Sequence, residues 1–252
     1  MSRRDDVSKT YDSSNVIQSI SNYLFILITI VSLATLFATD CPKEILIVFQ
    51  IVMVIVSTSI SVVDDFWLWY SAEAMRRKSA LESAFNIDMT GLQTDGYYNN
   101  TLSPSIDKFI VNIYESAYFS YNISKKMLLK ESAKAIIAII IFVVACLEIQ
   151  NGEIVLLIAQ TVFSGQYIVA FLALIFYNFR VDRLCGKFYE ILVSTGVVNQ
   201  KQQTCLLAAA IEYEAIKAHY RVRLSSKVYN KNNVYWSRKW AEIEEKIRIS
   251  YQ

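Results

Sequence analysis

The hydrophobic positions of this chain are gathered into four long stretches that polar segments separate. The stretches span residues 20–39, 45–63, 133–149 and 154–179. A helix needs about 20 mostly apolar residues to cross the hydrocarbon core of a bilayer, and each stretch approaches that length. The third is the shortest, with Lys134 and Glu148 near its ends, where long side chains reach the interface. The pattern therefore predicts four transmembrane helices.

The polar links inside each pair of stretches are very short. Residues 40–44 (DCPKE) join the first two, and residues 150–153 (QNGE) join the last two. Short links place consecutive helices antiparallel, so we expect two transmembrane hairpins. Both links then lie on one side of the membrane. The expected parts are an N-terminal segment 1–19, hairpin 20–63, an insert 64–132, hairpin 133–179 and a tail 180–252.

Lysine and arginine indicate which side is cytoplasmic. The chain has 25 of them, and Lys43 alone lies in a short link. Because basic residues accumulate on the cytoplasmic side, the insert, the tail and both termini are predicted to be cytoplasmic. Aromatic residues such as Trp67, Trp69 and Phe176 stand at the ends of stretches, where membrane interfaces favour them. We expect a multi-pass protein of the cell inner membrane.

The cytoplasmic segments are also predicted to be helical, which makes the fold class all-α. Only 6 Gly and 2 Pro occur in 252 residues, so breaks are few. Residues 64–85 are expected to continue the second span, and a Gly- and Asn-rich break follows. A helix from residue 105 should then lead into the third span. Tyr114, Tyr118 and Tyr121 recur at helical spacing on it, which indicates a packing face.

Enzyme chemistry finds little basis in this sequence. His219 is the single histidine, and the four cysteines have no paired spacing, so no metal site is expected. The chain lacks a P-loop, a dinucleotide-binding glycine motif, a nucleophile elbow and a metalloprotease motif. We expect neither catalysis nor a cofactor.

A polar stripe follows one face of the second span. Gln50, Ser57, Ser61 and Asp64 are spaced i, i+7, i+11 and i+14. Polar groups in hydrocarbon face other helices or water, so the stripe either bonds a neighbouring helix or lines a pore built from several copies. We favour the pore for this stripe because it ends in acids at the cytoplasmic side. The candidate pore-lining residues are Gln50, Ser57, Ser61, Asp64 and Asp65.

The tail concentrates basic and aromatic residues between positions 217 and 239. Phosphates are bound by basic groups, and bases stack on aromatic rings, so the composition fits a nucleotide or a short oligonucleotide. A solvated helix face that contacts anionic lipid headgroups explains the same composition. Both interpretations stand on the sequence. The candidate ligand-binding residues are Arg221, Arg223, Lys227, Tyr229, Tyr235, Trp236, Arg238 and Lys239.

The layout resembles a known family of bacterial membrane proteins. Local similarities are LESAF after the second stretch, YYNN and NIYESAYFSYNISKKM before the third, and VYNKNNVYWSRKW in the tail. They resemble four-transmembrane effectors encoded beside nucleotidyltransferases in anti-phage systems of the CBASS kind. No ligand residue of that family transfers position by position.

The resemblance implies a function as well as a topology. It implies a homo-oligomeric channel or membrane-permeabilising effector, such as a tetramer, that acts in abortive infection. Its ligand would be a nucleotide or short oligonucleotide made by a partner nucleotidyltransferase. The alternative is a non-channel membrane adaptor whose basic tail binds a protein partner or anionic lipid.

Overall fold

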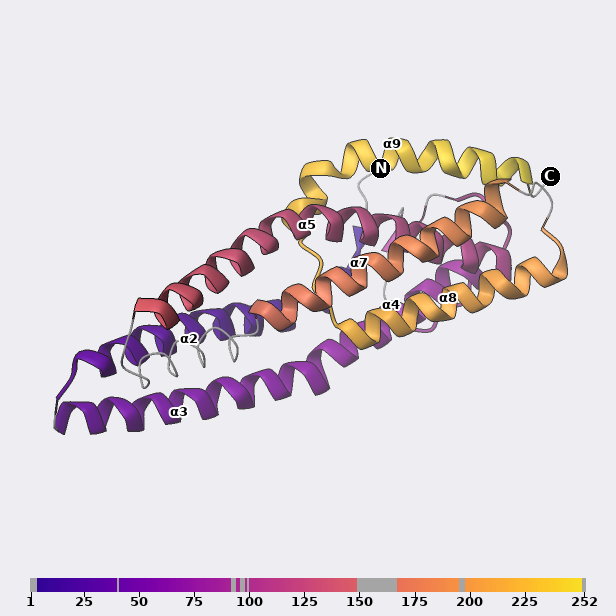
Figure 1. The fold of residues 1–252 in the computed structure, drawn as a ribbon. Helices are drawn as coiled ribbons and strands as arrows, with labels where there is room; N and C mark the ends of the chain where they lie inside the picture. Colours follow the sequence, from indigo (N-terminus) through magenta and orange to yellow (C-terminus); the bar gives the residue numbers. More distant parts are fainter. Residues whose placement is uncertain are drawn as a thin grey trace.

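The protein is helical almost throughout (Figure 1), as the sequence predicted. The computed structural model describes residues 4–39, 41–91, 94–95, 98, 100–148, 167–194 and 198–250. In these ranges the extended structure is one antiparallel pair of two-residue strands, β1 (Arg4–Asp5) and β2 (Thr94–Asp95). The helices are α1 (Asp6–Lys9), α2 (Asp12–Phe37), α3 (Cys41–Val63), η1 (Asp64–Leu68), α4 (Trp69–Phe85), α5 (Ile106–Glu148), α7 (Tyr167–Tyr189), η2 (Glu190–Ser194), α8 (Gln200–Tyr220) and α9 (Ser226–Ser250).

Two helical segments among the described residues are long and apolar enough to cross a membrane. They are Asp6–Ser32 and Cys41–Phe85, and their length and composition indicate membrane association. None of the residues of α3, all of which the structure describes, is buried, as expected for a surface that faces lipid. The predicted spans 133–149 and 154–179 lie partly outside the described residues, so four transmembrane helices stay a prediction.

The second span continues without interruption into the next helix, which confirms the prediction for residues 64–85. Helices α3, η1 and α4 form one rod, and η1 is a turn of π-helix inside it. The rod ends at Asn86, whose positive φ of 55° gives a left-handed cap. Helix α5 runs for 43 residues, about 65 Å at 1.5 Å per residue, and thereby joins the predicted insert to the third stretch.

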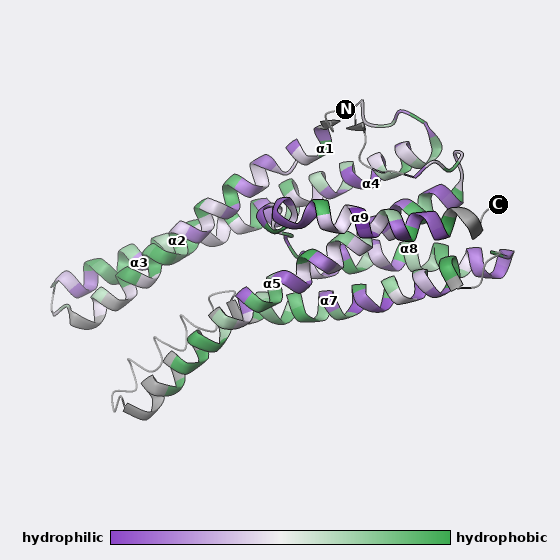
Figure 2. Cartoon of the chain, turned by 90° about the horizontal axis from the view of Figure 1, so that it is seen from above, coloured by the Kyte–Doolittle hydropathy of each residue, from purple (hydrophilic) through white to green (hydrophobic). Residues whose placement is uncertain are grey.

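The molecule has a helical body and two apolar arms. Seen from above in Figure 2, α2 and α3 form one arm, and the end of α5 extends as another that diverges from it. Hydrophobic residues are concentrated in the arms, whereas α4, α8 and α9 lie in the more polar body. The body is the part that the sequence assigns to the cytoplasm.

Aromatic packing holds the body together. The ring of Tyr114 on α5 stacks on Phe188 of α7 with centroids 5.1 Å apart, and Trp240 of α9 meets it edge-on at 5.1 Å. Tyr118, one turn further along α5, packs on the same Trp240 at 5.5 Å. The packing face predicted on this helix is confirmed for these two tyrosines. Tyr121 instead accepts a hydrogen bond from Lys125 at 3.0 Å.

Candidate ligand-binding site

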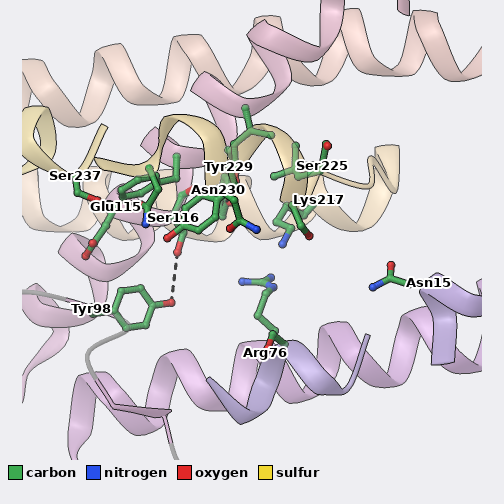
Figure 3. A pocket seen from close by; sticks show the side chains of 18 of the residues that line it. Asn15, Arg76, Tyr98, Glu115, Ser116, Lys217, Ser225, Tyr229, Asn230 and Ser237 are labelled. Atoms are coloured by element: carbon green, nitrogen blue, oxygen red, sulfur yellow. Dashed lines mark hydrogen bonds between the residues drawn. The ribbon is translucent and has the colours of Figure 1, made fainter. Parts of the chain in front are cut away.

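A polar cavity of about 820 Å³ lies inside the body. Its walls come from the N-terminal helices and from α4, α5, α8 and α9. Figure 3 shows Arg76 reaching into it from α4, with Lys217 of α8 and the α9 residues Tyr229 and Asn230 on the opposite side. Ligand pockets of proteins commonly measure about 300–1,000 Å³, so this cavity has the size of a small-molecule site.

Helix α9 contributes one of the cavity walls because it is amphipathic. Its buried face carries Trp236 and Trp240, which are 3% and 1% exposed. The neighbouring face presents Tyr229, Asn233 and Ser237, spaced four residues apart, to the cavity. The Ser237 hydroxyl donates to Asn233 Oδ1 at 3.0 Å, and the Tyr229 ring lies 5.9 Å from Phe119. This wall therefore offers an aromatic ring beside amide and hydroxyl groups.

Two cations of the cavity wall are held by carboxylates behind it. Glu73 accepts from Arg76 Nε at 2.9 Å and lies 3.2 Å from Lys217 Nζ, and Tyr11 donates to it at 2.8 Å. Glu214 takes the other end of the Arg76 guanidinium, with Nη1 at 3.1 Å. Burial by itself raises the pKa of Glu73, but Lys217, Arg76 and these hydrogen bonds outweigh it and lower the pKa to about 2. Burial and the neighbouring Arg76 lower the pKa of Lys217.

Hydroxyl groups on α5 and α8 form a second fixed part of the wall. Tyr213 is fully buried apart from 1% of its surface, and its hydroxyl lies 2.8 Å from Ser120 Oγ. It also donates to the Ser116 carbonyl at 3.2 Å. Tyr98 reaches Ser116 Oγ from the side at 3.4 Å, the contact drawn as a dashed line in Figure 3. Burial raises the pKa of Tyr213, so this phenol stays protonated and keeps its hydrogen to donate.

The charges around the cavity leave no positive excess, because Glu73 and Glu214 already pair with its two cations. Arg76 and Lys217 contribute two positive groups, while Asp12 and Glu115 contribute two negative ones. The cavity is thus no general anion trap of the kind that binds long oligonucleotides through phosphate contacts alone. It fits a ligand that combines an aromatic ring, groups that pair with amides, and a small net charge.

The segment between α8 and α9, residues 221–225, connects this cavity to the α2–α3 hairpin. Leu224 and Ser225 line the cavity. Two residues earlier than Ser225, Arg223 forms an ion pair with Asp64, and its Nη1 donates to Ser14 Oγ at 2.7 Å. Ser14 Oγ in turn donates to Asp64 Oδ1 at 2.6 Å. The guanidinium also lies over the Trp69 ring, 4.7 Å from its centroid.

The ion pair between Arg223 and Asp64 lies at the start of the π-helical turn η1. Asp64 is the first residue of η1, where the α-helix of the arm opens into a turn of π-helix. Such turns are uncommon and frequently occur at functional sites. Asp65 beside it lies 3.4 Å from Arg221 Nη1, so both acids at this end of α3 face arginines of the tail.

The five predicted pore-lining residues differ in their surroundings. Gln50 donates to Ser32 of α2 at 3.2 Å, and Ser61 lies 3.4 Å from Ser21 of α2. Asp64 is 3% exposed and bound by Arg223 and Ser14. Within one protomer these three side chains therefore bond neighbouring segments, which is the alternative to lining a pore. Ser57 is partly buried, and Asp65 keeps a side chain that is 46% exposed.

The eight predicted ligand residues are not all brought together. Tyr229 lines the polar cavity, whereas Arg221 and Arg223 line a second cavity and face Asp65 and Asp64. Trp236 packs into the core and lines neither cavity. The rest lie elsewhere on α9: Lys227 and Tyr235 are exposed, Arg238 stands over the Tyr235 ring, and Lys239 is paired with Glu242.

The sequence interpretation missed most of the cavity wall. Arg76 was counted only among the basic residues of the cytoplasmic side, and Glu115 carried no signal beside the tyrosines of α5. Lys217 did stand in the basic segment of the tail, and Asn230 and Asn233 follow Tyr229 on one helix. On α9, the polar residues recur at helical spacing on a face beside that of the tryptophans. This pattern could have predicted that the polar residues line a cavity.

No protein-family model, curated protein or solved structure matches this chain.

Proposed function

We propose that this protein is a membrane effector in which a small polar ligand, bound in the body, controls the α2–α3 arm. The observation that carries the proposal is the double role of residues 221–225. Leu224 and Ser225 line the polar cavity, and Arg223 holds Asp64 directly after the last residue of α3. A ligand that moves this segment changes the Arg223–Asp64 pair directly.

The ligand class that fits the cavity best is a nucleotide. Tyr229 offers a stacking surface, and Asn230 and Asn233 offer amides for the edge of a base. Arg76 and Lys217, although paired with Glu73 and Glu214, keep further N–H groups that can donate to a phosphate. Asp12 and Glu115 in the same wall oppose a high negative charge. We therefore propose a mononucleotide or a compact cyclic dinucleotide in preference to a longer oligonucleotide.

The output is membrane permeation by several copies of the chain. A carboxylate ring favours cations, and symmetric association would bring copies of Asp64 and Asp65 together at the cytoplasmic mouth of a pore. In the structure Asp64 is neutralised by Arg223, so we propose that this is a closed arrangement. Ligand binding would separate the pair and expose the ring. The homo-oligomer, the four spans and a role in abortive infection belong to this proposal.

Ligand binding is tested with two tyrosines of α9 that form a matched pair. Tyr229 lines the cavity and Tyr235 lies exposed outside it. Titration of the detergent-solubilised chain with mononucleotides, cyclic dinucleotides and short oligonucleotides should give binding that Tyr229→Ala weakens roughly 5- to 150-fold, since stacking contributes about 1–3 kcal/mol per base. Tyr235→Ala should bind like the wild type. Equal losses in both variants would place the site on the outer face of α9.

Permeation is tested separately in liposomes. Release of a trapped ion should depend on the nucleotide in the wild type and lose that dependence in Arg223→Gln, while the nucleotide still binds. Asp64→Asn should reduce cation preference, and the change Ile55→Leu on the exposed face of α3 should not. A wild-type chain that binds no nucleotide at micromolar concentration and releases no ion would fit the membrane adaptor instead.

A further inference from the structure

A second cavity, of about 600 Å³, lies where the two arms leave the body. It is lined by α2, by the end of α3 and the start of η1, by α5 and α7, and by the 220–223 segment. Both candidate spans, Asp6–Ser32 and Cys41–Phe85, contribute to its wall. The cavity is therefore at the boundary between the apolar arms and the polar body.

The wall of this cavity combines apolar and charged residues. Helix α7 supplies Val169, Phe171 and Leu174, and Val169 is 65% exposed. Arg221 and Asp65 add charged groups to the same wall. A soluble metabolite gains nothing from the apolar part, whereas a lipid places its headgroup on the charged groups and its chains along α7.

The charges of the wall select among headgroups. Arg223 and Asp64 neutralise each other through their buried ion pair. Arg221 and Asp65 are 3.4 Å apart but keep side chains that are 43% and 46% exposed. Two arginines that face two aspartates leave no positive excess for an anionic headgroup. A headgroup that carries both a phosphate and an ammonium matches both signs.

We propose that this cavity binds a zwitterionic phospholipid of the phosphoethanolamine class. The phosphate lies against Arg221, the ammonium against Asp65, and the upper part of the chains against Val169 and Phe171. The lipid thereby fills the space between the two arms at the point where they leave the body. This site is separate from the nucleotide cavity, and it does not depend on the function proposed above.

The experiment measures lipid retention by the full chain. Protein is extracted from vesicles that hold equal amounts of phosphatidylethanolamine and phosphatidylglycerol, and retained lipid is measured by native mass spectrometry. The wild type should retain phosphatidylethanolamine preferentially, and Arg221→Gln should reduce that retention about tenfold, as expected for the loss of one charge-assisted contact. Arg238→Gln, an exposed arginine of α9 outside the cavity, is the matched control and should retain lipid like the wild type.

A second variant tests the same site by volume. Ala173 lines the cavity from α7, and Ala173→Trp should fill it and displace the lipid while leaving both arginines in place. Thermal unfolding establishes that each variant is folded. Equal retention of the two lipids by the wild type, or retention unchanged in both site variants, would overturn the proposal. Displacement of the lipid by soluble glycerophosphoethanolamine at equal concentration would also overturn it, because the apolar wall would then contribute nothing.

Discussion

Arg223 and Asp64 form an ion pair although 159 residues separate them in the chain. Ser14 bonds both partners, so one cluster joins α2, the start of η1 and the segment between α8 and α9. The Asp64 side chain is 5% exposed and that of Arg223 is 23% exposed. The contact is thus a mostly buried link between the tail and the α2–α3 hairpin.

Removing the arginine should destabilise the protein strongly. Arg223→Gln leaves the Asp64 carboxylate buried without its counter-charge, and breaking one side of a buried pair costs about 3–5 kcal/mol. Chemical unfolding in detergent measures this loss. Arg238→Gln, on the exposed face of α9, should change the free energy of unfolding by less than about 0.5 kcal/mol. A similar small change in both variants would mean that Asp64 is hydrated.

Stability should fall in acid because of Glu73. Its pKa is lowered from 4.5 to about 2, so the carboxylate stabilises the fold fully above pH 4.5 and loses this contribution as the pH falls from 4.5 towards 2. The reason is that protonation removes its ion pairs with Arg76 and Lys217. Thermal unfolding across this pH range measures the effect. Glu73→Gln should be less stable at neutral pH and should show a flatter dependence on pH in the same window.

The secondary structure followed from local pattern, and the site did not. Hydrophobic periodicity predicted the continuous helix through residues 64–85 and the long helix from residue 105, because both depend on neighbours in sequence. The aromatic residues of the tail looked alike in composition. Trp236 and Trp240 pack into the core, while Tyr229 lines the cavity, because α9 presents different faces to α5 and to the cavity. Only the packing of α9 on the body distinguishes the core tryptophans from the tyrosine that lines the cavity.

Pairing between distant residues escaped the sequence for a different reason. Arg221 and Arg223 were predicted to bind phosphate, and they face Asp65 and Asp64. Asp64 and Asp65 were predicted to line a pore. The sequence does not show that the basic residues contact the acidic pair, because only the tertiary fold brings the 221–225 segment to the end of α3.

Trp240 should contribute far more to stability than an exposed aromatic residue of the same helix. It is 1% exposed and packs on both Tyr114 and Tyr118. Trp240→Ala should therefore lower the free energy of unfolding by about 3–5 kcal/mol. Tyr235→Ala, at a position 54% exposed, should lower it by less than about 1 kcal/mol. Denaturant titration of the two variants gives the comparison, and equal losses would contradict this packing of α9.

The orientation in the membrane can be tested with the native cysteines. Cys41 is exposed at the start of α3, within the short link (residues 40–44) that we predict to lie outside, and Cys205 lies partly exposed on α8 in the body that we predict to be cytoplasmic. A membrane-impermeant maleimide added to intact cells should label Cys41 and should label Cys205 only after the membrane is permeabilised. Cys185 should react slowly in either case, because burial raises the pKa of its thiol and the thiolate is the reactive form.

The variants Cys41→Ser and Cys205→Ser assign the labelled sites by mass. In intact cells, labelling should disappear in Cys41→Ser and remain in Cys205→Ser. Labelling of Cys205 in intact cells would reverse the orientation and place the ligand cavity outside. A nucleotide made in the cytoplasm would then have no access to Tyr229 and Asn230, so this measurement also tests the proposed ligand.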